Sequence, residues 1–275
     1  MRIRRILVYF ILITFFATWM LPLLSVILTC LKSEKQILYL PFWYLPPLSE
    51  IHFLENTTTA WGTLKLSKSF LNTLIYSSIS PTVAVFLASL IAFPLAKMKF
   101  RGKNAVFYFA LIGTFLPFQM YLVPDLKILS ALRLFNTRIG LILVYTSICI
   151  PFATILIRNY MLTLPDWLLD AAKLDGLSYF GIYGKIILPL CTPALVIAFL
   201  FQFIWVWNEM LFGMVLTHSS STRPLMTQLA MLKGSYITSF GVMAAGAVTS
   251  IIMPVIIVLV FQKRFTQGFI APSER

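Results

Sequence analysis

Long apolar stretches without charged residues alternate with short polar segments along the chain. A helix that crosses the hydrocarbon core of a bilayer needs about 20 mostly apolar residues. Six stretches approach or exceed that length, at residues 6–31, 71–96, 104–124, 139–157, 186–212 and 240–262. The pattern predicts an all-α polytopic membrane protein, with six transmembrane helices forming one domain over residues 1–275.

Composition points the same way and excludes other classes. Hydrophobic residues make up 59% of the chain and charged residues 11%, whereas a soluble domain carries about 25% charged residues. The net charge of +13 does not indicate a nucleic-acid partner, because the basic residues lie at the ends of apolar runs. The three cysteines, Cys30, Cys149 and Cys191, lie in or beside apolar runs without metal-ligand spacing. We therefore expect no metal and no cofactor on this chain.

The distribution of lysine and arginine predicts the orientation in the membrane. One face would carry 13 basic residues, on segments 1–5, 97–103, 158–185 and 263–275, and the other face would carry 9 over longer loops. Cytoplasmic loops are the ones enriched in these residues, so we expect both termini in the cytoplasm. The first run is too long for a signal peptide and no small-x-small cleavage site follows it, so it is predicted to be a retained span.

Two long loops lie on the predicted outer face. Residues 32–69 combine three prolines with the aromatic run Phe42, Trp43 and Tyr44. Aromatic side chains favour the headgroup zone, so this loop is expected to follow the membrane interface. Residues 217–239 turn apolar at "LMTQLAML", which predicts a short amphipathic helix or a re-entrant segment.

A polar segment at residues 163–182 separates the fourth and fifth apolar runs and is predicted to face the cytoplasm. Thr163 is suited to cap a helix, with Pro165 in its first turn and Asp166 in a position like that of a capping box. The three-four spacing places one apolar face of this helix at Leu164, Leu168 and Ala171. The segment is thus expected to begin with a short amphipathic helix.

The second half of this segment carries a turn signal. Gly176 suits the left-handed turn that ends a helix, and Ser178 can cap the next one. Ala171 and Ala172 would let another protein approach the backbone closely. The alternative is an ordinary amphipathic helix on the membrane surface. Its three acids, Asp166, Asp170 and Asp175, weigh against that alternative, because a helix on anionic lipid is usually basic.

The stretch "DAAKLDGLSYFGIYGKIILPLCTPAL" resembles the EAA loop of permease subunits in binding-protein-dependent ABC importers. Nearly the whole chain is similar to the carbohydrate branch of that family, the maltose and glycerol-3-phosphate type. The other segments that carry the resemblance are "SFLNTLIYS", "LAKMKFRGK", "LPFQMYLVP", "LFNTRIGLILVY" and "WVWNEMLF". Two positions depart from the family pattern: Asp170 replaces the usual glutamate, and the tail "QGFIAPSER" lacks a glycine-rich ending.

The resemblance implies a transport subunit in the inner membrane of a bacterial cell, and not an enzyme. It implies four kinds of partner: a second homologous permease subunit, two ATP-binding cassette subunits that carry ATP and magnesium, an extracytoplasmic sugar-binding protein, and membrane lipid. It also implies that segment 163–182 is a cytoplasmic coupling loop that couples ATP hydrolysis to movement of the permease. The residues implied to contact the ATPase are Asp170, Ala171, Ala172, Asp175 and Gly176.

Four polar residues are candidates for the substrate path or gate: Asn72, Gln119, Asn208 and Glu209. Glu209 is the one acid within the six apolar runs, and an acid at mid-membrane costs about 2.5–3.5 kcal/mol. Because it lies near the outer end of its run, just after Trp205 and Trp207, a structural acid at the interface is the alternative. Gln119 lies between Pro117 and Pro124, which are predicted to break the helix.

The remaining polar candidates leave the substrate class open. Asn72 can simply cap the second span. Amides and tryptophans with few charges suit a neutral sugar better than an ion. The alternative functions are an ion-coupled secondary transporter, for which only Glu209 is available, and an intramembrane enzyme, for which no nucleophile–base pair is present.

Overall fold

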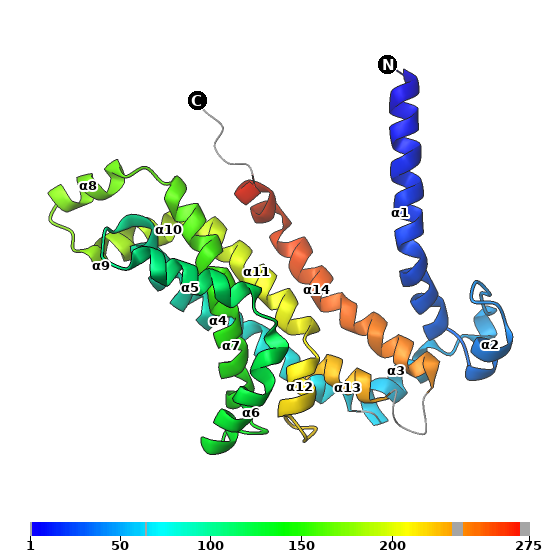
Figure 1. Ribbon diagram of the computed structural model, residues 1–275. Coiled ribbons are helices and arrows are strands. Elements are labelled where there is room, and N and C mark those ends of the chain that lie inside the picture. Colours follow the sequence, from blue (N-terminus) through cyan, green and yellow to red (C-terminus); the bar gives the residue numbers. More distant parts are fainter. Residues whose placement is uncertain (1, 64, 233–238, 270–275) are drawn as a thin grey trace. The chain divides into compact units, whose positions relative to one another are not determined.

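The computed structural model describes residues 2–63, 65–232 and 239–269, and within these ranges the regular structure is helical throughout (Figure 1). The longer helices are α1 (Arg2–Cys30), α4 (Leu66–Lys97), α5 (Lys103–Phe115), α6 (Leu122–Ala131), α7 (Arg138–Thr163), α11 (Thr192–Asn208) and α14 (Phe240–Phe269). The shorter ones are α2 (Glu34–Tyr39), η1 (Leu48–Glu50), α3 (Phe53–Thr58), η2 (Thr59–Thr63), η3 (Phe118–Tyr121), α8 (Trp167–Leu174), α9 (Tyr179–Ile182), η4 (Tyr183–Ile187), α10 (Leu188–Leu190), α12 (Leu211–Leu216) and α13 (Leu225–Leu232).

Four of these helices are long and apolar enough to cross a membrane: α1, α4, α7 and α14. The third and fifth predicted spans are bent instead of straight. The pair formed by residues 103–115 and 118–131 bends by 97°, and the pair formed by residues 179–190 and 192–208 bends by 72°. If each bent pair is one span, the described chain has six candidate crossings. The all-helical class is therefore confirmed, with four to six spans.

Proline explains part of the first bend. Helix α5 ends at Phe115, and Pro117 follows as the N-cap residue of η3. The helix cannot continue through Pro117, because proline lacks the backbone N–H that would donate the next helical hydrogen bond. Pro124 was also predicted to break the helix, and that prediction is wrong. It lies in the first turn of α6, where a missing N–H removes no intrahelical bond.

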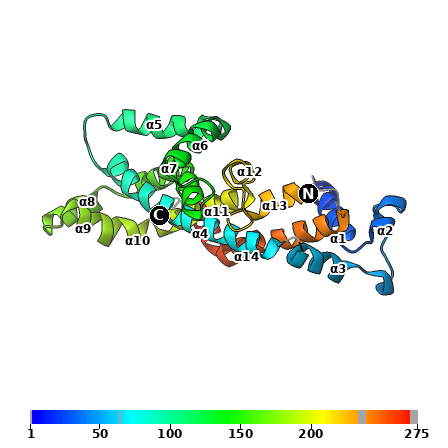
Figure 2. The ribbon, with the colours of Figure 1, turned by 90° about the horizontal axis from the view of Figure 1, so that it is seen from below.

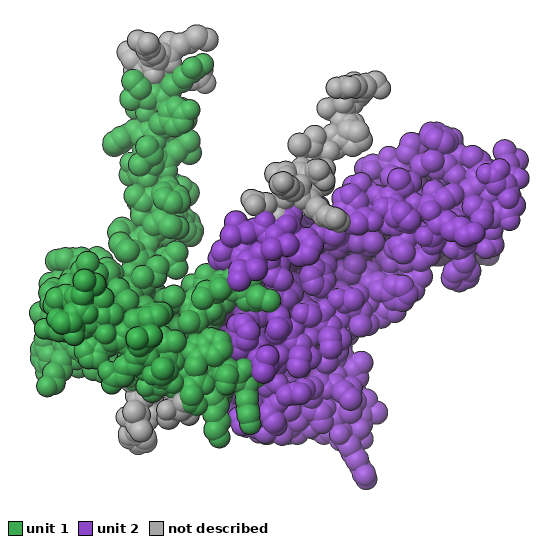
Figure 3. Space-filling view, turned by 180° about the vertical axis from the view of Figure 1, so that it is seen from behind, with its two compact units in different colours: residues 1–68, 228–253 green, residues 69–227, 254–275 purple. Residues whose placement is uncertain are grey.

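The chain forms two compact units, coloured separately in Figure 3. Unit 1 comprises residues 1–68 and 228–253, and unit 2 comprises residues 69–227 and 254–275. Unit 1 contains α1, whose apolar window has no buried residue within the protein. It also contains most of the predicted helix at "LMTQLAML", which is confirmed as α13. Residues 233–238 of that predicted loop lie outside the described residues, as does most of the C-terminal tail.

Unit 2 is built around α7, which packs against α5 and α11. Figures 1 and 2 show α8 and α9 at one end of this unit and α6 and α12 at the other. Each end has its own apolar core. The core at the α8 end includes Phe93, Ile157, Met161, Leu169, Ala172 and Ile187. The core at the α12 end includes Tyr76, Tyr145, Val206, Phe212 and Leu216. These two cores position the two sites described next.

Candidate functional site

The first site is an elbow formed by α8, the turn after it, and α9. Helix α8 ends at Leu174, and Gly176 follows with φ of +79°. The N–H of Gly176 donates to the carbonyl oxygen of Lys173, and the N–H of Leu177 donates to that of Ala172, both at 3.0 Å. This pair of bonds is a Schellman C-cap, which requires a left-handed residue and so favours glycine. The predicted turn at Gly176 is confirmed.

The start of the second elbow helix also matches the prediction. Ser178 has an extended backbone, and its Oγ accepts a hydrogen bond from the N–H of Gly181 at 3.3 Å. A serine at this position satisfies one of the unpaired N–H groups in the first turn. Helix α9 therefore starts where the sequence indicated. Helical geometry then continues through η4 and α10, as far as the bend at Cys191.

The predicted cap of the first elbow helix is wrong. Thr163 is the last residue of α7, and its hydroxyl donates to the carbonyl oxygen of Tyr160 at 2.8 Å. Asp166 occupies the N-cap position of α8, without a side-chain capping bond. Its carboxylate instead accepts from the Nζ of Lys97 at 2.6 Å. The partner comes from α4, which lies far away in the sequence, so the local pattern could not predict it.

The pair between Lys97 and Asp166 attaches the elbow to the end of α4. The Lys97 side chain is 2% exposed, and its Nζ also donates to the carbonyl oxygen of Leu164. This hydrogen bond and the Lys97 charge hold the pKa of the Asp166 carboxyl below its ordinary value, and the charges of Lys99 and Lys103 act in the same direction. The attraction is therefore complete at neutral pH and is lost only as the pH falls through that lowered pKa.

The buried face of α8 is rotated by about one residue from the predicted face. Leu169 and Ala172 are buried in the core at this end of unit 2, whereas Ala171 is exposed. Leu168 is only half-buried. The two alanines therefore differ: Ala172 packs against its own chain, and only Ala171 is open to another protein. The prediction that both alanines permit close approach is wrong for Ala172.

The exposed face of the elbow is unusually apolar. Trp167 is 65% exposed, Leu174 is 90% exposed, and Phe180 on α9 is 84% exposed. Asp170 lies on the same helix, exposed, 3.8 Å from the ammonium of Lys173. Contiguous exposed apolar side chains mark interaction surfaces in folded proteins. The elbow thus presents Trp167, Ala171 and Leu174 outward, and this exposure of the tryptophan and the leucine was not predicted.

The second site is a groove of about 660 Å³ in unit 2. Three of the four candidate path residues line it: Gln119, Asn208 and Glu209. The remaining lining is apolar or aromatic, and consists of Phe118, Phe201, Ile204, Trp205, Met210 and Leu211. A neighbouring cavity of about 770 Å³ shares Phe118, Phe201 and Trp205 with this groove. Amides beside aromatic rings offer hydrogen bonds and stacking surfaces to a neutral polar ligand.

Glu209 is held in place by bonds within the chain. It follows the last residue of α11, and its Oε1 accepts from the N–H of Phe212 at 2.8 Å. Its Oε2 accepts from the hydroxyl of Tyr145 at 2.6 Å and from the N–H of Gly213 at 3.3 Å. The carboxylate thus satisfies the free N–H groups at the start of α12. This geometry favours the structural alternative for Glu209, and the role of Tyr145 was not anticipated.

Asn72 serves as a structural link and does not line the groove. Its Nδ2 donates to the carbonyl oxygen of Arg223 at 3.1 Å, and its Oδ1 accepts from the Nε of Arg138 at 3.0 Å. The side chain is fully buried. It therefore connects the start of α4 to the start of α7 and to the loop before α13. The structure does not bring Asn72 together with the other three candidates.

The Glu209 geometry leads to a prediction about its substitution. Glu209→Gln keeps one oxygen for the N–H of Phe212, and its amide can donate to Tyr145, so that only the long bond from the N–H of Gly213 is lost. We therefore expect near-normal assembly and only a modest loss of uptake. Glu209→Leu removes every acceptor and leaves buried donors unpaired, at a cost of about 1–3 kcal/mol each. Thermal unfolding in detergent should show a marked loss for Glu209→Leu only. Loss of transport by Glu209→Gln in a fully stable protein would contradict the structural role.

Comparison with known proteins identifies the class of protein that carries these two sites. Residues 84–270 match the family described as "Binding-protein-dependent transport system inner membrane component". The chain belongs to this family. The match includes the elbow and the groove, and a component of this family is a transport subunit whose ATPase is a separate chain.

Relatives of this inner membrane component cover most of its length. It is 31% identical to the osmoprotective compounds uptake permease protein GgtD of Synechocystis sp., over 93% of this chain and 87% of that protein. It is 30% identical to the arabinooligosaccharides transport system permease protein AraQ of Bacillus subtilis, over 91% and 88%.

A solved structure shares the fold. It is the crystal structure of a bacterial ABC transporter involved in the import of the acidic polysaccharide alginate, and its matching chain superposes with a TM-score of 0.77 at 24% identity. The match covers 98% of this chain and 97% of that one.

Proposed function

We propose that this inner membrane component is the permease subunit of an ATP-driven importer for a neutral sugar or oligosaccharide. The family match over residues 84–270 carries the proposal, because it contains both the elbow and the groove. The similarity to AraQ, a permease of an arabinooligosaccharide transport system, supports the substrate class. The amide and aromatic lining of the groove supports it independently.

The elbow is the site that we assign to coupling. It forms most of the predicted coupling loop at residues 163–182, with Asp170, Ala171, Asp175 and Gly176 toward the ATPase and Ala172 holding α8 on its own core. The apolar side chains of Trp167 and Leu174 would be covered by the ATPase surface. The Lys97–Asp166 pair would pass movement of the elbow directly to α4. The ATPase must contact the elbow differently in its two states, since equal binding would shift nothing.

The proposal includes a topology and a set of partners. The chain would form one domain over residues 1–275, with six spans, both termini in the cytoplasm, and the two bent helix pairs as the third and fifth spans. The elbow would then face the cytoplasm, as the basic segment at residues 97–103 also favours. The partners would be a second permease subunit, two ATPase subunits that bind ATP and magnesium, and an extracytoplasmic sugar-binding protein.

Reconstitution tests this function directly. The chain would be purified with its partner subunits and placed in liposomes, and uptake of a labelled arabino-oligosaccharide or maltose would be measured with ATP inside. We expect uptake that requires both ATP and the binding protein. Uptake driven by an ion gradient without ATP would instead support the secondary-transporter alternative.

The groove leads to a separate prediction. Gln119→Ala and Asn208→Ala each remove an exposed amide from the groove, and we expect uptake to fall by about fivefold to tenfold, as loss of one hydrogen bond to a ligand costs about 1 kcal/mol. ATP hydrolysis stimulated by the binding protein should be retained. The matched control is Asn159→Ala, which removes an amide that does not line the groove. If Gln119→Ala and Asn208→Ala retained as much uptake as the control Asn159→Ala, the substrate path would lie elsewhere.

A further inference from the structure

A loop in unit 1 carries twelve consecutive residues without a charged side chain. Residues 37–48 read "ILYLPFWYLPPL", and we call this segment the aromatic loop. Most of its large side chains are strongly exposed: Leu38 by 64%, Tyr39 by 82%, Phe42 by 53%, Trp43 by 67%, Leu45 by 63% and Leu48 by 91%. An apolar surface of this kind on a folded segment requires an apolar partner.

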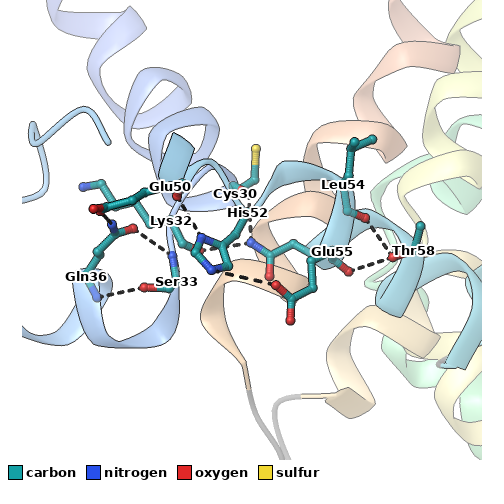
Figure 4. A network of polar contacts seen from close by, with 10 residues as sticks. Cys30, Lys32, Ser33, Gln36, Glu50, His52, Leu54, Glu55 and Thr58 are labelled. Carbon is teal, nitrogen blue, oxygen red and sulfur yellow. Dashed lines mark hydrogen bonds and ion pairs between the residues drawn. The ribbon is translucent and has the colours of Figure 1, made fainter. Parts of the chain in front are cut away.

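Two polar side chains beside the aromatic loop, those of Lys32 and Gln36, are turned inward. Lys32 is 2% exposed, and its Nζ donates to the carbonyl oxygens of Pro41 at 3.1 Å and Phe42 at 2.8 Å. Gln36 is buried, closes a capping box with Ser33, and donates to Glu50 at 2.8 Å. Figure 4 shows Gln36 directed toward Ser33 and Glu50. The segment is thus polar inside and apolar outside, the reverse of a loop in water.

This reversed arrangement fits lipid better than a protein partner. In hydrocarbon, a free backbone carbonyl costs several kcal/mol, so it must be paired within the chain. Lys32 supplies that pairing for Pro41 and Phe42, directly beneath the exposed rings. A protein interface, in contrast, carries about one hydrogen bond per 100–200 Å², and such an interface would need polar groups on the outward face of the loop.

The position of the loop favours the membrane interface. The aromatic loop begins seven residues after the end of α1 at Cys30, and α1 is a candidate membrane span whose side chains are exposed. Tryptophan and tyrosine concentrate at the level of the lipid headgroups. The charged residues Lys35 and Glu50 lie just outside the two ends of the loop, and both are exposed.

From these observations we propose that the aromatic loop is a lipid anchor. Its rings lie in the boundary between headgroups and acyl chains, on the side of the membrane where α1 ends. The buried ammonium of Lys32 is the group that holds the loop backbone in this shape. The anchor would fix the start of the long connection between α1 and α4 at the membrane surface.

Spin labelling tests the anchor without adding a charge. The three native cysteines are buried, so Trp43→Cys can be labelled with a nitroxide in the full chain with its partner subunits, in nanodiscs of phosphatidylethanolamine and phosphatidylglycerol. We expect the label to collide more with oxygen, which is enriched in lipid, than with a water-soluble nickel complex. A second label at Leu48→Cys should behave alike. The control Lys35→Cys should show the opposite preference.

Each other outcome overturns the proposal. A label at position 43 that is accessible to nickel would place the loop in water. A label that is shielded from both reagents would place it against a protein partner.

In the Lys32→Met background, the label at position 43 should become more mobile and lose part of its preference for oxygen. An unchanged spectrum there would overturn the role assigned to Lys32.

Discussion

Ala171→Trp is expected to abolish most ATP-dependent uptake while leaving the protein folded and inserted. Ala171 lies on the exposed face of α8, where we place the contact with the ATPase. A tryptophan there would hold the two surfaces apart, and overpacking of a fitted surface costs about 1–3 kcal/mol. That cost corresponds to a loss of about tenfold or more. Uptake, ATP hydrolysis and co-purification of the ATPase would be measured on the same preparation.

Two matched variants make this experiment specific. Ala105→Trp adds the same bulk at an exposed position in the first turn of α5 and should leave uptake unchanged. Ala172→Trp changes the neighbouring alanine, which is 3% exposed and lies in the core of unit 2, so it should lower the unfolding temperature. Full uptake by a stable Ala171→Trp protein would contradict the coupling role that we assign to the elbow.

Gly176→Val is the second substitution with a large expected effect. The glycine has φ of +79°, and a β-carbon there would meet no atom within 4 Å. The cost is therefore conformational: a residue with a side chain pays about 1–2 kcal/mol in the left-handed region, and a β-branched one pays more. The Schellman cap would open, and coupled ATP hydrolysis and uptake should fall together by about tenfold.

The controls for Gly176 use the same chemistry. Gly184→Val adds the same side chain at a helical glycine whose β-carbon would also meet nothing within 4 Å, and it should be tolerated. Gly176→Asn should retain most activity, because asparagine adopts the left-handed conformation more readily than valine. If Gly176→Asn failed as badly as Gly176→Val, the backbone conformation would not be the reason.

The elbow shows how far local sequence signals reach. Gly176 and Ser178 were located correctly, because a left-handed turn and an N-cap depend on one residue and its immediate neighbours. Thr163 was assigned wrongly, because α7 continues to that residue and Asp166 is engaged by Lys97 from α4. The sequence also could not show that Ala171 faces outward and Ala172 inward, since three-four spacing leaves the centre of an apolar face uncertain by about one residue.

The groove shows the same limit for polar residues within the apolar runs. The sequence singled out Gln119, Asn208 and Glu209, and the structure brings these three together. For Asn72 it offered a helix cap as the alternative, whereas α4 begins at Leu66 and Asn72 bonds to Arg138 and Arg223. It also gave no sign that Tyr145 donates to Glu209 across a separation of 64 residues. The two residues meet only because α7 packs against α11.

By itself, the sequence determined the apolar stretches, the all-helical class, the turn at Gly176 and the polar residues available to a ligand. Those properties follow from solvent preference and backbone conformation, which act residue by residue. The tertiary structure decided which alanine of the elbow faces outward, that two of the six apolar runs bend sharply, and that Glu209 caps α12. Such properties depend on contacts between segments far apart in the chain, and a contact of that kind exists only once the helices have packed.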